Sequence, residues 1–124
     1  MEELTYKKFL YAMNQIAEKV KIYGNNSIFG IPRGGLVPAV YLSHLTGLPL
    51  VDFIEKEDKP LIIDDIIDSG KTLEPYYKEG YTIASIYYHK QSVFEPVIWV
   101  YEKKDDWIKF PWETNETTKS KSLE

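Results

Sequence analysis

The sequence predicts an α/β domain: a three-layer arrangement with a mostly parallel central sheet of about five strands flanked by helices. Two observations predict this class. Short, nearly continuous apolar runs, typical of strands that are buried on both faces, alternate with stretches that have helical periodicity. The chain has 124 residues, of which 44% are hydrophobic and 27% are charged, and this suits one soluble domain with a single core.

The first half of the chain predicts two helices around one strand. In Leu4–Val20, apolar residues recur at three- and four-residue spacing, which is typical of an amphipathic helix. Gly24 and the residues after it break this helix, and Ser27–Ile31 is a strand that we expect to be buried on both faces. After a tight loop, Leu36–Thr46 is predicted to be a helix that Gly47 ends.

The second half predicts the rest of the sheet. The expected strands and the one short helix are Leu48–Ile54, Leu61–Asp64, helix Leu73–Lys78, Tyr81–Tyr88 and Val97–Tyr101. A loop over Asp65–Thr72 separates the second of these strands from the helix. We expect one domain over residues 1–113 and a polar C-terminal tail over residues 114–124.

Composition excludes several functional classes. Fifteen Lys and Arg against nineteen Asp and Glu give a net charge of −4, which disfavours a general nucleic-acid binder. The absence of Cys removes thiol nucleophiles and cysteine-based zinc sites. No apolar run approaches the roughly 20 residues of a membrane span, and the acidic start Met1–Glu3 is unlike a secretory signal. We therefore expect a cytoplasmic protein that binds no membrane.

A first candidate site follows the strand at Ser27–Ile31. There the chain runs through Pro32-Arg33-Gly34-Gly35 into a helix, so that backbone N–H groups at the helix N-terminus can stabilise an anion. Arg33 adds a cation whose geometry suits phosphate oxygens. The alternative is an ordinary strand-to-helix turn with a solvated arginine, since short glycine-rich turns are common.

A second candidate site lies in Leu61–Leu73. Asp64 and Asp65 end a buried strand, Asp68 follows three residues later, and a Ser-Gly-Lys-Thr turn leads into a helix. Carboxylates at a strand end can bind a sugar diol and Mg²⁺, and the turn offers N–H and hydroxyl donors for a phosphate. A nucleoside-triphosphatase loop would need Gly where Asp65 stands, so that interpretation fails. The alternative, in which Asp68 or the following serine caps a helix, does not explain all of these features together.

This second segment, Leu61–Leu73, resembles the signature of the type I phosphoribosyltransferases: a hydrophobic strand, two acids, two hydrophobic residues, Asp, then Ser/Thr-Gly-x-Thr. Ile31–Leu36 resembles the pyrophosphate loop of that family and lies at the expected distance upstream. Ile86–Lys90 and Asp106–Glu113 resemble the C-terminal part of the xanthine/guanine phosphoribosyltransferases. The resemblance implies transfer of the phosphoribosyl group from phosphoribosyl pyrophosphate to a 6-oxopurine base (guanine, xanthine or hypoxanthine), giving a nucleoside monophosphate and pyrophosphate, with Mg²⁺ as cofactor.

The resemblance also implies a role for each matching residue. Asp68 would be catalytic, beside N7 of the purine, where it would manage the N7 proton. Asp64 and Asp65 would meet the ribose hydroxyls, with Asp65 as the metal contact through solvent or substrate. The other substrate-binding residues would be Ser69, Gly70, Lys71 and Thr72 at the 5′-phosphate, Arg33 and Gly34 at the pyrophosphate, Lys90 at the 6-oxo group and Trp107 on the ring. A surface lysine and a core tryptophan are the alternatives for the last two.

One departure from the family bears on activity. Its enzymes usually carry a long mobile loop between the second strand and the acidic motif, whereas only Glu55–Pro60 separates them here, so the lid is shortened or missing. This favours a second hypothesis, a catalytically weak relative that binds a nucleotide or phosphoribosyl pyrophosphate as a sensor or sequestering module. Asp68, Lys90 and Trp107 favour the enzyme, because a phosphate sensor would need none of them. The 15% aromatic content suits a homodimer or larger homo-oligomer.

Overall fold

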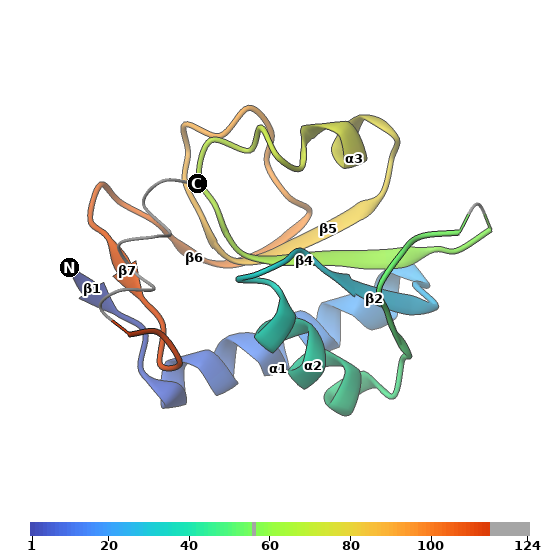
Figure 1. Cartoon of the computed structure of the whole chain (residues 1–124), viewed down its shortest axis with the longest axis horizontal. Helices are drawn as coiled ribbons and strands as arrows, with labels where there is room; N and C mark the ends of the chain where they lie inside the picture. The colour runs from blue at the N-terminus through green and yellow to red at the C-terminus, as the bar shows by residue number, and fades with distance from the viewer. Residues whose placement is uncertain (56, 115–124) are drawn as a thin grey trace.

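The computed structural model describes residues 1–55 and 57–114. Its elements, in chain order, are β1 (Glu2–Glu3), α1 (Tyr6–Tyr23), β2 (Ser27–Gly30), α2 (Leu36–Thr46), β3 (Leu50–Val51), β4 (Pro60–Ile67), α3 (Glu74–Lys78), β5 (Thr82–Tyr88), β6 (Ile98–Glu102) and β7 (Ile108–Lys109) (Figure 1). The expected polar tail falls outside the described residues from position 115 onward, so the boundary after residue 113 stays a prediction. No helix within the described ranges is long and apolar enough to cross a bilayer.

The main sheet has five parallel strands in the order β3-β2-β4-β5-β6, which confirms the predicted class. β2 and β4 are neighbours, with Ile28 opposite Leu61 and Gly30 opposite Ile63. The two strands that lead into the candidate sites are therefore adjacent. In a parallel sheet their carboxyl ends open on the same edge, which is where such folds bind ligands.

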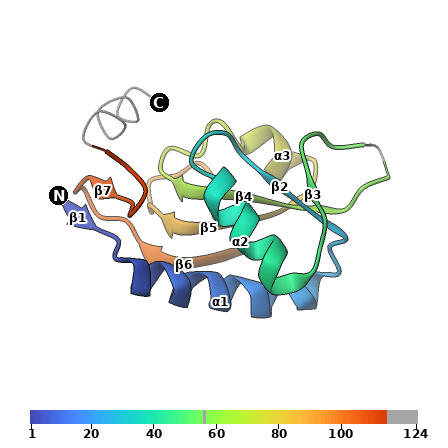
Figure 2. The ribbon, with the colours of Figure 1, turned by 60° about the horizontal axis from the view of Figure 1, so that its bottom comes forward.

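The sheet is covered on both faces. Helices α1 and α2 lie together on one face, and α3 lies on the other (Figures 1 and 2). Successive side chains of β4 point to opposite faces of the sheet, so its apolar residues belong to two cores. Leu61 and Ile63 pack with α1 and α2, whereas Ile62 packs with Leu73 and Phe94 on the α3 side. This explains why the central strands are continuous apolar runs in the sequence.

Two strands differ from the sequence prediction by more than one residue at an end. β4 was expected to end at Asp64, but it continues through Ile67, because Ile66 and Ile67 pair with Tyr87 and Tyr88 of the long strand β5. The acid pair therefore lies within a strand and not at its end. The opposite error affects β3, which the sequence predicted over Leu48–Ile54. It is an edge strand that pairs only with the short β2, and two residues suffice for that.

The sequence did not predict β1 and β7, which form a separate parallel pair with Glu2 opposite Ile108. Each strand has two residues, too few to show alternation. The carboxylate of Glu2 accepts a hydrogen bond from the Tyr87 hydroxyl at 2.7 Å, and the N–H of Glu2 donates to the carbonyl of Trp107 at 2.7 Å. The N-terminal segment thus fastens the segment that carries Trp107 to the main sheet.

Candidate active site

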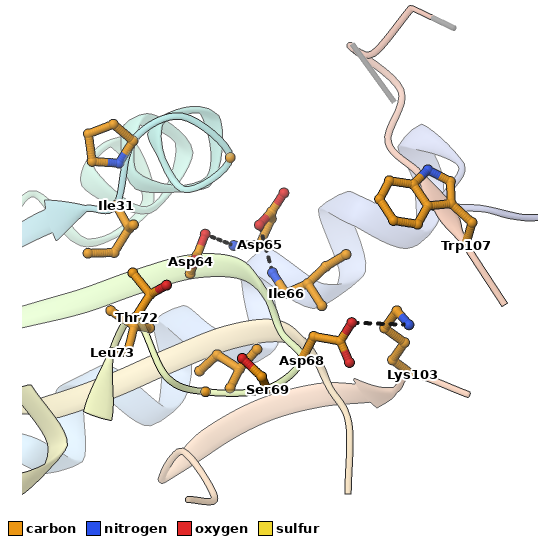
Figure 3. Close-up of a pocket in the computed structure, with 14 residues that line it drawn as sticks. Ile31, Asp64, Asp65, Ile66, Asp68, Ser69, Thr72, Leu73, Lys103 and Trp107 are labelled. Carbon is orange, nitrogen blue, oxygen red and sulfur yellow. Dashed lines mark hydrogen bonds and ion pairs between the residues drawn. The ribbon is translucent and has the colours of Figure 1, made fainter. Parts of the chain in front are cut away.

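A pocket of about 410 Å³ opens at the carboxyl ends of β2, β4 and β6 (Figure 3). Its lining comes from the loop after β2, the last part of β4, the loop from β4 to α3, and the segment between β6 and β7. These residues are Ile31, Pro32, Gly34, Asp64, Asp65, Ile66, Ile67, Asp68, Ser69, Gly70, Thr72, Leu73, Lys103 and Trp107. Both candidate sites of the sequence therefore belong to one cavity.

The acid pair occupies the part of β4 that extends past the end of β2. Asp64 is half-buried and its carboxylate accepts the N–H of Asp65 at 2.8 Å, while the carboxylate of Asp65 accepts the N–H of Ile66 at 2.7 Å. Asp65 is only 2% exposed. A Cβ atom at Gly34 would come within 3.0 Å of the Asp65 carboxyl group, so glycine is needed for the loop to approach this side chain.

The loop after β2 is held against β4 by its backbone. The N–H of Ile31 donates to the carbonyl of Ile63 at 3.0 Å, and the N–H of Gly35 donates to the carbonyl of Ile31 at 2.7 Å. Gly35 is the N-cap of α2, and the peptide bond between Pro32 and Arg33 is cis. The N-terminus of α2 follows this loop, which approaches Asp65, and a helix N-terminus favours an anion.

The loop from β4 to α3 is held in shape by hydrogen bonds at Ser69. The hydroxyl of Ser69 accepts the N–H of Lys71 at 3.3 Å, and the backbone carbonyl of Ser69 accepts the N–H of Val93 at 2.9 Å. Gly70 has φ +79°, and a Cβ atom there would meet Ser92 and Phe94, so two constraints call for glycine.

The same loop rules out one alternative for its polar residues. α3 begins at Glu74, its N-cap is Leu73, and it has no side-chain cap. Neither Asp68 nor Ser69 therefore caps this helix, and the helix-cap interpretation of these two residues is wrong.

Asp68 shares the pocket lining with two residues of the segment between β6 and β7, Lys103 and Trp107. The ammonium group of Lys103 lies 3.5 Å from the Asp68 carboxylate, and the Trp107 ring stands beside this pair (Figure 3). The other Asp68 oxygen accepts the side-chain amide of Gln91 at 3.4 Å. The indole N–H of Trp107 is buried and has no hydrogen-bond partner among the described residues. A carboxylate, a cation and an aromatic face are thus available to one ligand.

Three predicted site residues do not line this pocket: Arg33, Lys71 and Lys90. All three are exposed. Lys90 was expected at the base, but its side chain is 76% exposed and pairs at 3.6 Å with Glu102. It belongs to a turn in which the N–H of Ser92 donates to the carbonyl of His89 at 3.0 Å, and this turn carries it off the end of β5.

The sequence analysis missed Lys103. It follows β6 directly, as Asp68 follows β4 and Arg33 comes shortly after β2, so a rule that collects the charged residues just after each strand would have found it. The neighbouring Lys104, in contrast, bonds Glu102 at 2.9 Å, and this hydrogen bond, together with the charges of Lys104 and Lys90, lowers the pKa of the Glu102 carboxyl.

Asp64 and Asp65 also match the donor set that Mg²⁺ requires. That ion is usually held by one or two carboxylates together with waters and substrate phosphates. The Asp65 carboxyl group lies close to Gly34, in the loop that the sequence predicts to bind an anion. The residues present therefore fit a magnesium ion that arrives with a phosphorylated substrate.

The chain matches no protein-family model, but it is clearly similar to individual known proteins. It is 32% identical over 117 residues to a xanthine-guanine phosphoribosyltransferase of Cereibacter sphaeroides, in an alignment that covers 70% of this chain and 68% of that protein. The crystal structure of a purine phosphoribosyltransferase from Pyrococcus horikoshii OT3 matches with a TM-score of 0.78 and 32% identity over 91% of this chain and 93% of that one.

A further solved structure supports the fold alone. The xanthine-guanine-hypoxanthine phosphoribosyltransferase of Helicobacter pylori matches with a TM-score of 0.78 and 20% identity over 98% of both chains. The parallel sheet, the pocket at its carboxyl edge and these relatives agree with the signature that the sequence carries at its acid pair and phosphate-type turn. On this evidence the chain belongs to the type I phosphoribosyltransferases, and its relatives point to the xanthine/guanine group within that family.

Proposed function

We propose that this chain transfers the phosphoribosyl group of phosphoribosyl pyrophosphate to a 6-oxopurine base, giving a nucleoside monophosphate and pyrophosphate. The observation that carries the proposal is that a single pocket contains the acid pair, the phosphate-type turn, Asp68 and Trp107. A simple phosphate-binding protein would have no use for an aromatic face and a third carboxylate in the same pocket. A homodimer or larger homo-oligomer in the cytoplasm is part of this proposal.

The phosphate groups would bind at the two loops. The turn Ser69–Thr72 offers N–H and hydroxyl donors to the 5′-phosphate, and its exposed Lys71 would add a cation if its side chain turned toward the phosphate. The pyrophosphate would lie at Gly34 and the N-terminus of α2, where the exposed Arg33 can fold over it. Neutralising the leaving pyrophosphate stabilises the oxocarbenium-like transition state of this chemistry.

The acid pair would hold the sugar. Asp64 and Asp65 would accept hydrogen bonds from the ribose 2′- and 3′-hydroxyls, and Asp65 would contact Mg²⁺ through solvent or substrate. When bound, the ion would neutralise charge on the pyrophosphate. The backbone N–H groups that both carboxylates accept hold them in place before substrate arrives.

The base would stack on Trp107 and present N7 to Asp68. In the transfer, the bond from C1′ to the pyrophosphate oxygen breaks, and its electron pair leaves with pyrophosphate. The N9 lone pair forms the new bond to C1′, and the N7 proton passes to the Asp68 carboxylate. Asp68 is 48% exposed at its side chain, so that the proton can continue to solvent.

A second function is favoured by one observation. The connection between β3 and β4 is only residues 52–59, too short for a long lid over the pocket. Without a lid, water could compete with the base for the activated sugar. The chain would then serve as a sensor or sequestering module for a nucleotide or phosphoribosyl pyrophosphate.

A steady-state assay separates the two functions. Phosphoribosyl pyrophosphate, Mg²⁺ and guanine, xanthine or hypoxanthine are mixed with the protein, and nucleotide formation is followed, with adenine as the matched base that lacks the 6-oxo group. Turnover with at least one 6-oxopurine is expected. Binding of phosphoribosyl pyrophosphate by titration calorimetry, combined with no turnover on any base, would support the sensor instead.

A further inference from the structure

The turn that follows β5 is bonded to the stretch of chain where β4 gives way to the phosphate-type turn. The N–H of His89 donates to the carbonyl of Ile67 at 2.9 Å, and the N–H of Val93 donates to the carbonyl of Ser69 at 2.9 Å. Residues 89–93 form this β5 turn, and the two residues that it bonds both line the pocket. The β5 turn is thus fixed at two points against the edge of the pocket.

Gln91 reaches from the β5 turn to Asp68, which lies between the two bonded positions. Its side-chain amide donates to one oxygen of the Asp68 carboxylate at 3.4 Å, and the Lys103 ammonium group lies 3.5 Å from the other oxygen. The terminal torsion of an aspartate is soft, so a single partner leaves the carboxylate free to turn. A donor on each oxygen restricts this rotation and still leaves lone pairs for one more donor.

The His89 ring holds the backbone of Gln91 in place. Gln91 is exposed, so its hold on Asp68 depends on how firmly the β5 turn fixes its backbone. The Nδ1 atom of His89 accepts the backbone N–H of Gln91 at 3.1 Å, and the His89 carbonyl accepts the N–H of Ser92 at 3.0 Å. One residue therefore closes the β5 turn with both its ring and its backbone.

This contact also fixes the proton on the ring. An imidazole nitrogen accepts a hydrogen bond only when it carries no proton, so the ring proton of His89 lies on Nε2. Nε2 lies 3.5 Å from the carboxylate of Asp105, in the connection that also carries Trp107. The His89 side chain is 13% exposed, so little room is left for the ring to turn.

We propose that His89 is a positioning residue for the transfer reaction. Through Nδ1 it fixes Gln91, and through Gln91 it sets the orientation in which the Asp68 carboxylate meets the N7 proton of the base. This inference rests on the proposed function. Proton transfer requires the two groups within hydrogen-bond reach, and a small misplacement of a reacting group lowers the rate. His89 does not line the pocket, so it acts on the reaction only through the residues that it holds.

The test compares His89→Leu with His89→Asn, two replacements that branch at the same atom. Asn carries its carbonyl oxygen as many bonds from Cβ as the Nδ1 atom of histidine, whereas Leu has no acceptor there. His89→Leu should lower kcat about 3- to 10-fold and leave KM and calorimetric affinity for phosphoribosyl pyrophosphate unchanged, and His89→Asn should recover most of the rate. Equal rates in the two variants would overturn the inference. So would a loss of affinity for phosphoribosyl pyrophosphate as large as the loss of kcat, since His89 would then support the whole pocket.

A double-mutant cycle tests the route through Gln91. Gln91→Leu removes the donor to Asp68 at an exposed position, so it should lower kcat by about the same factor even if His89→Leu proves too unstable to assay. The double variant should be no slower than either single one, because two residues that act in one chain of contacts are not additive. Additive losses would contradict the route. Val93→Ala shortens an exposed side chain of the same turn, keeps its backbone N–H, and should have the kcat of wild type.

A measurement that needs no turnover separates failure of this inference from failure of the proposed function. The NMR order parameter of the Gln91 side-chain amide should be high in wild type and in His89→Asn and low in His89→Leu. This pattern in a wild type without turnover would refute the enzyme and retain the contact from His89 through Gln91. An active wild type whose Gln91 amide is equally ordered in all three proteins would retain the enzyme and refute the role of His89.

Discussion

Asp68 stands where β4 gives way to the phosphate-type turn, with one oxygen toward Lys103 and the other toward Gln91. We predict that Asp68→Asn, which keeps the size of the side chain but cannot take up the N7 proton, lowers turnover by roughly 10²–10⁴-fold. The affinity for phosphoribosyl pyrophosphate should change little, because the Asp68 carboxylate pairs with Lys103 and Gln91 and not with the acid pair. Rate measurement and calorimetry on the same preparation check this.

The control for Asp68→Asn is stability. An amide beside the Lys103 ammonium can still accept a hydrogen bond through its oxygen, so the melting temperature should fall only slightly. A variant with wild-type turnover would contradict the catalytic assignment. A variant that loses binding of phosphoribosyl pyrophosphate would show that Asp68 supports the sugar-phosphate site instead.

At the scale of elements, the extension of β4 past β2 places the carboxylates of Asp64 and Asp65 in the lining of the pocket. We predict that phosphoribosyl pyrophosphate binds in a Mg²⁺-dependent manner, and that replacing both Asp64 and Asp65 by Asn weakens binding by at least about tenfold and removes the dependence on Mg²⁺. Calorimetric titrations with Mg²⁺ and with a chelator test this for both proteins. Equal affinity of the wild type under the two conditions would contradict the metal role.

The hydrogen bond between Tyr87 of β5 and Glu2 of β1 gives a prediction about how stability depends on pH. Burial raises the pKa of the Tyr87 hydroxyl above its ordinary value of 10.0, and its hydrogen bond to Glu2 raises it further. Above pH 10 the unfolded chain therefore releases a proton that the folded chain keeps. The free energy of unfolding should accordingly fall as the pH rises above about 10.

Tyr87→Phe isolates this contribution. At pH 7 the variant should lose about 1 kcal/mol, since the hydrogen bond to Glu2 disappears, but its stability should fall less steeply than that of wild type between pH 9 and 11, values that bracket the tyrosine pKa. Urea unfolding across this range measures both effects, and Tyr23→Phe on the exposed end of α1 is the matched control. Parallel pH profiles for wild type and Tyr87→Phe would contradict the prediction.

At the scale of the whole molecule, helix α2 and the neighbouring edge strand β3 expose several apolar side chains. α2 carries apolar residues on both of its faces, so that Leu36, Val40 and Leu45 are 44%, 43% and 45% exposed, and Leu50 on the edge strand β3 is 47% exposed. Leu36 and Leu50 line the same shallow depression. A helix that is apolar all round is usually buried, which supports the expected homo-oligomer.

We predict that this face contains the contact between copies. Sedimentation equilibrium should give a mass that is a multiple of 14.5 kDa for the wild type, and Val40→Glu should shift the protein toward the single-chain mass because it buries a charge in the contact. Lys19→Glu, on the exposed side of α1, should leave the mass unchanged. A wild type with the mass of one chain would contradict the prediction.

Much of this architecture could be predicted from the sequence because local physics and the global fold agree. An apolar run such as Leu61–Ile63 is fully buried only in a strand whose sheet is covered on both faces, so it predicts a parallel α/β sheet. Helix α2 was predicted with its observed bounds, since Gly47 with φ +75° ends it through a local backbone conformation. Most of the candidate site was equally local: Asp64 to Thr72 are close in sequence and their chemistry shows in their order.

The errors have a common cause, which is contact with a distant segment. The end of β4 is decided by its pairing with β5, the short length of β3 by its place at the edge, and the existence of β1 by a two-residue partner more than a hundred positions away. Pairing energy between strands depends on which backbone lies alongside, and the propensity of a short segment does not contain that information.

The part of the pocket where the base is expected shows the same difference between what is local in the sequence and what depends on distant contacts. Lys90 and Lys103 are the example. The sequence by itself determined, through its resemblance to the family, the prediction that a cation at a strand end accompanies Asp68 and Trp107. Only the tertiary structure decided which lysine is available, because a turn carries Lys90 out to solvent while a backbone hydrogen bond to Tyr88 holds Lys103 at the pocket wall. The physical reason is that the direction of a long side chain depends on the burial and pairing around it, and these are properties of the folded chain.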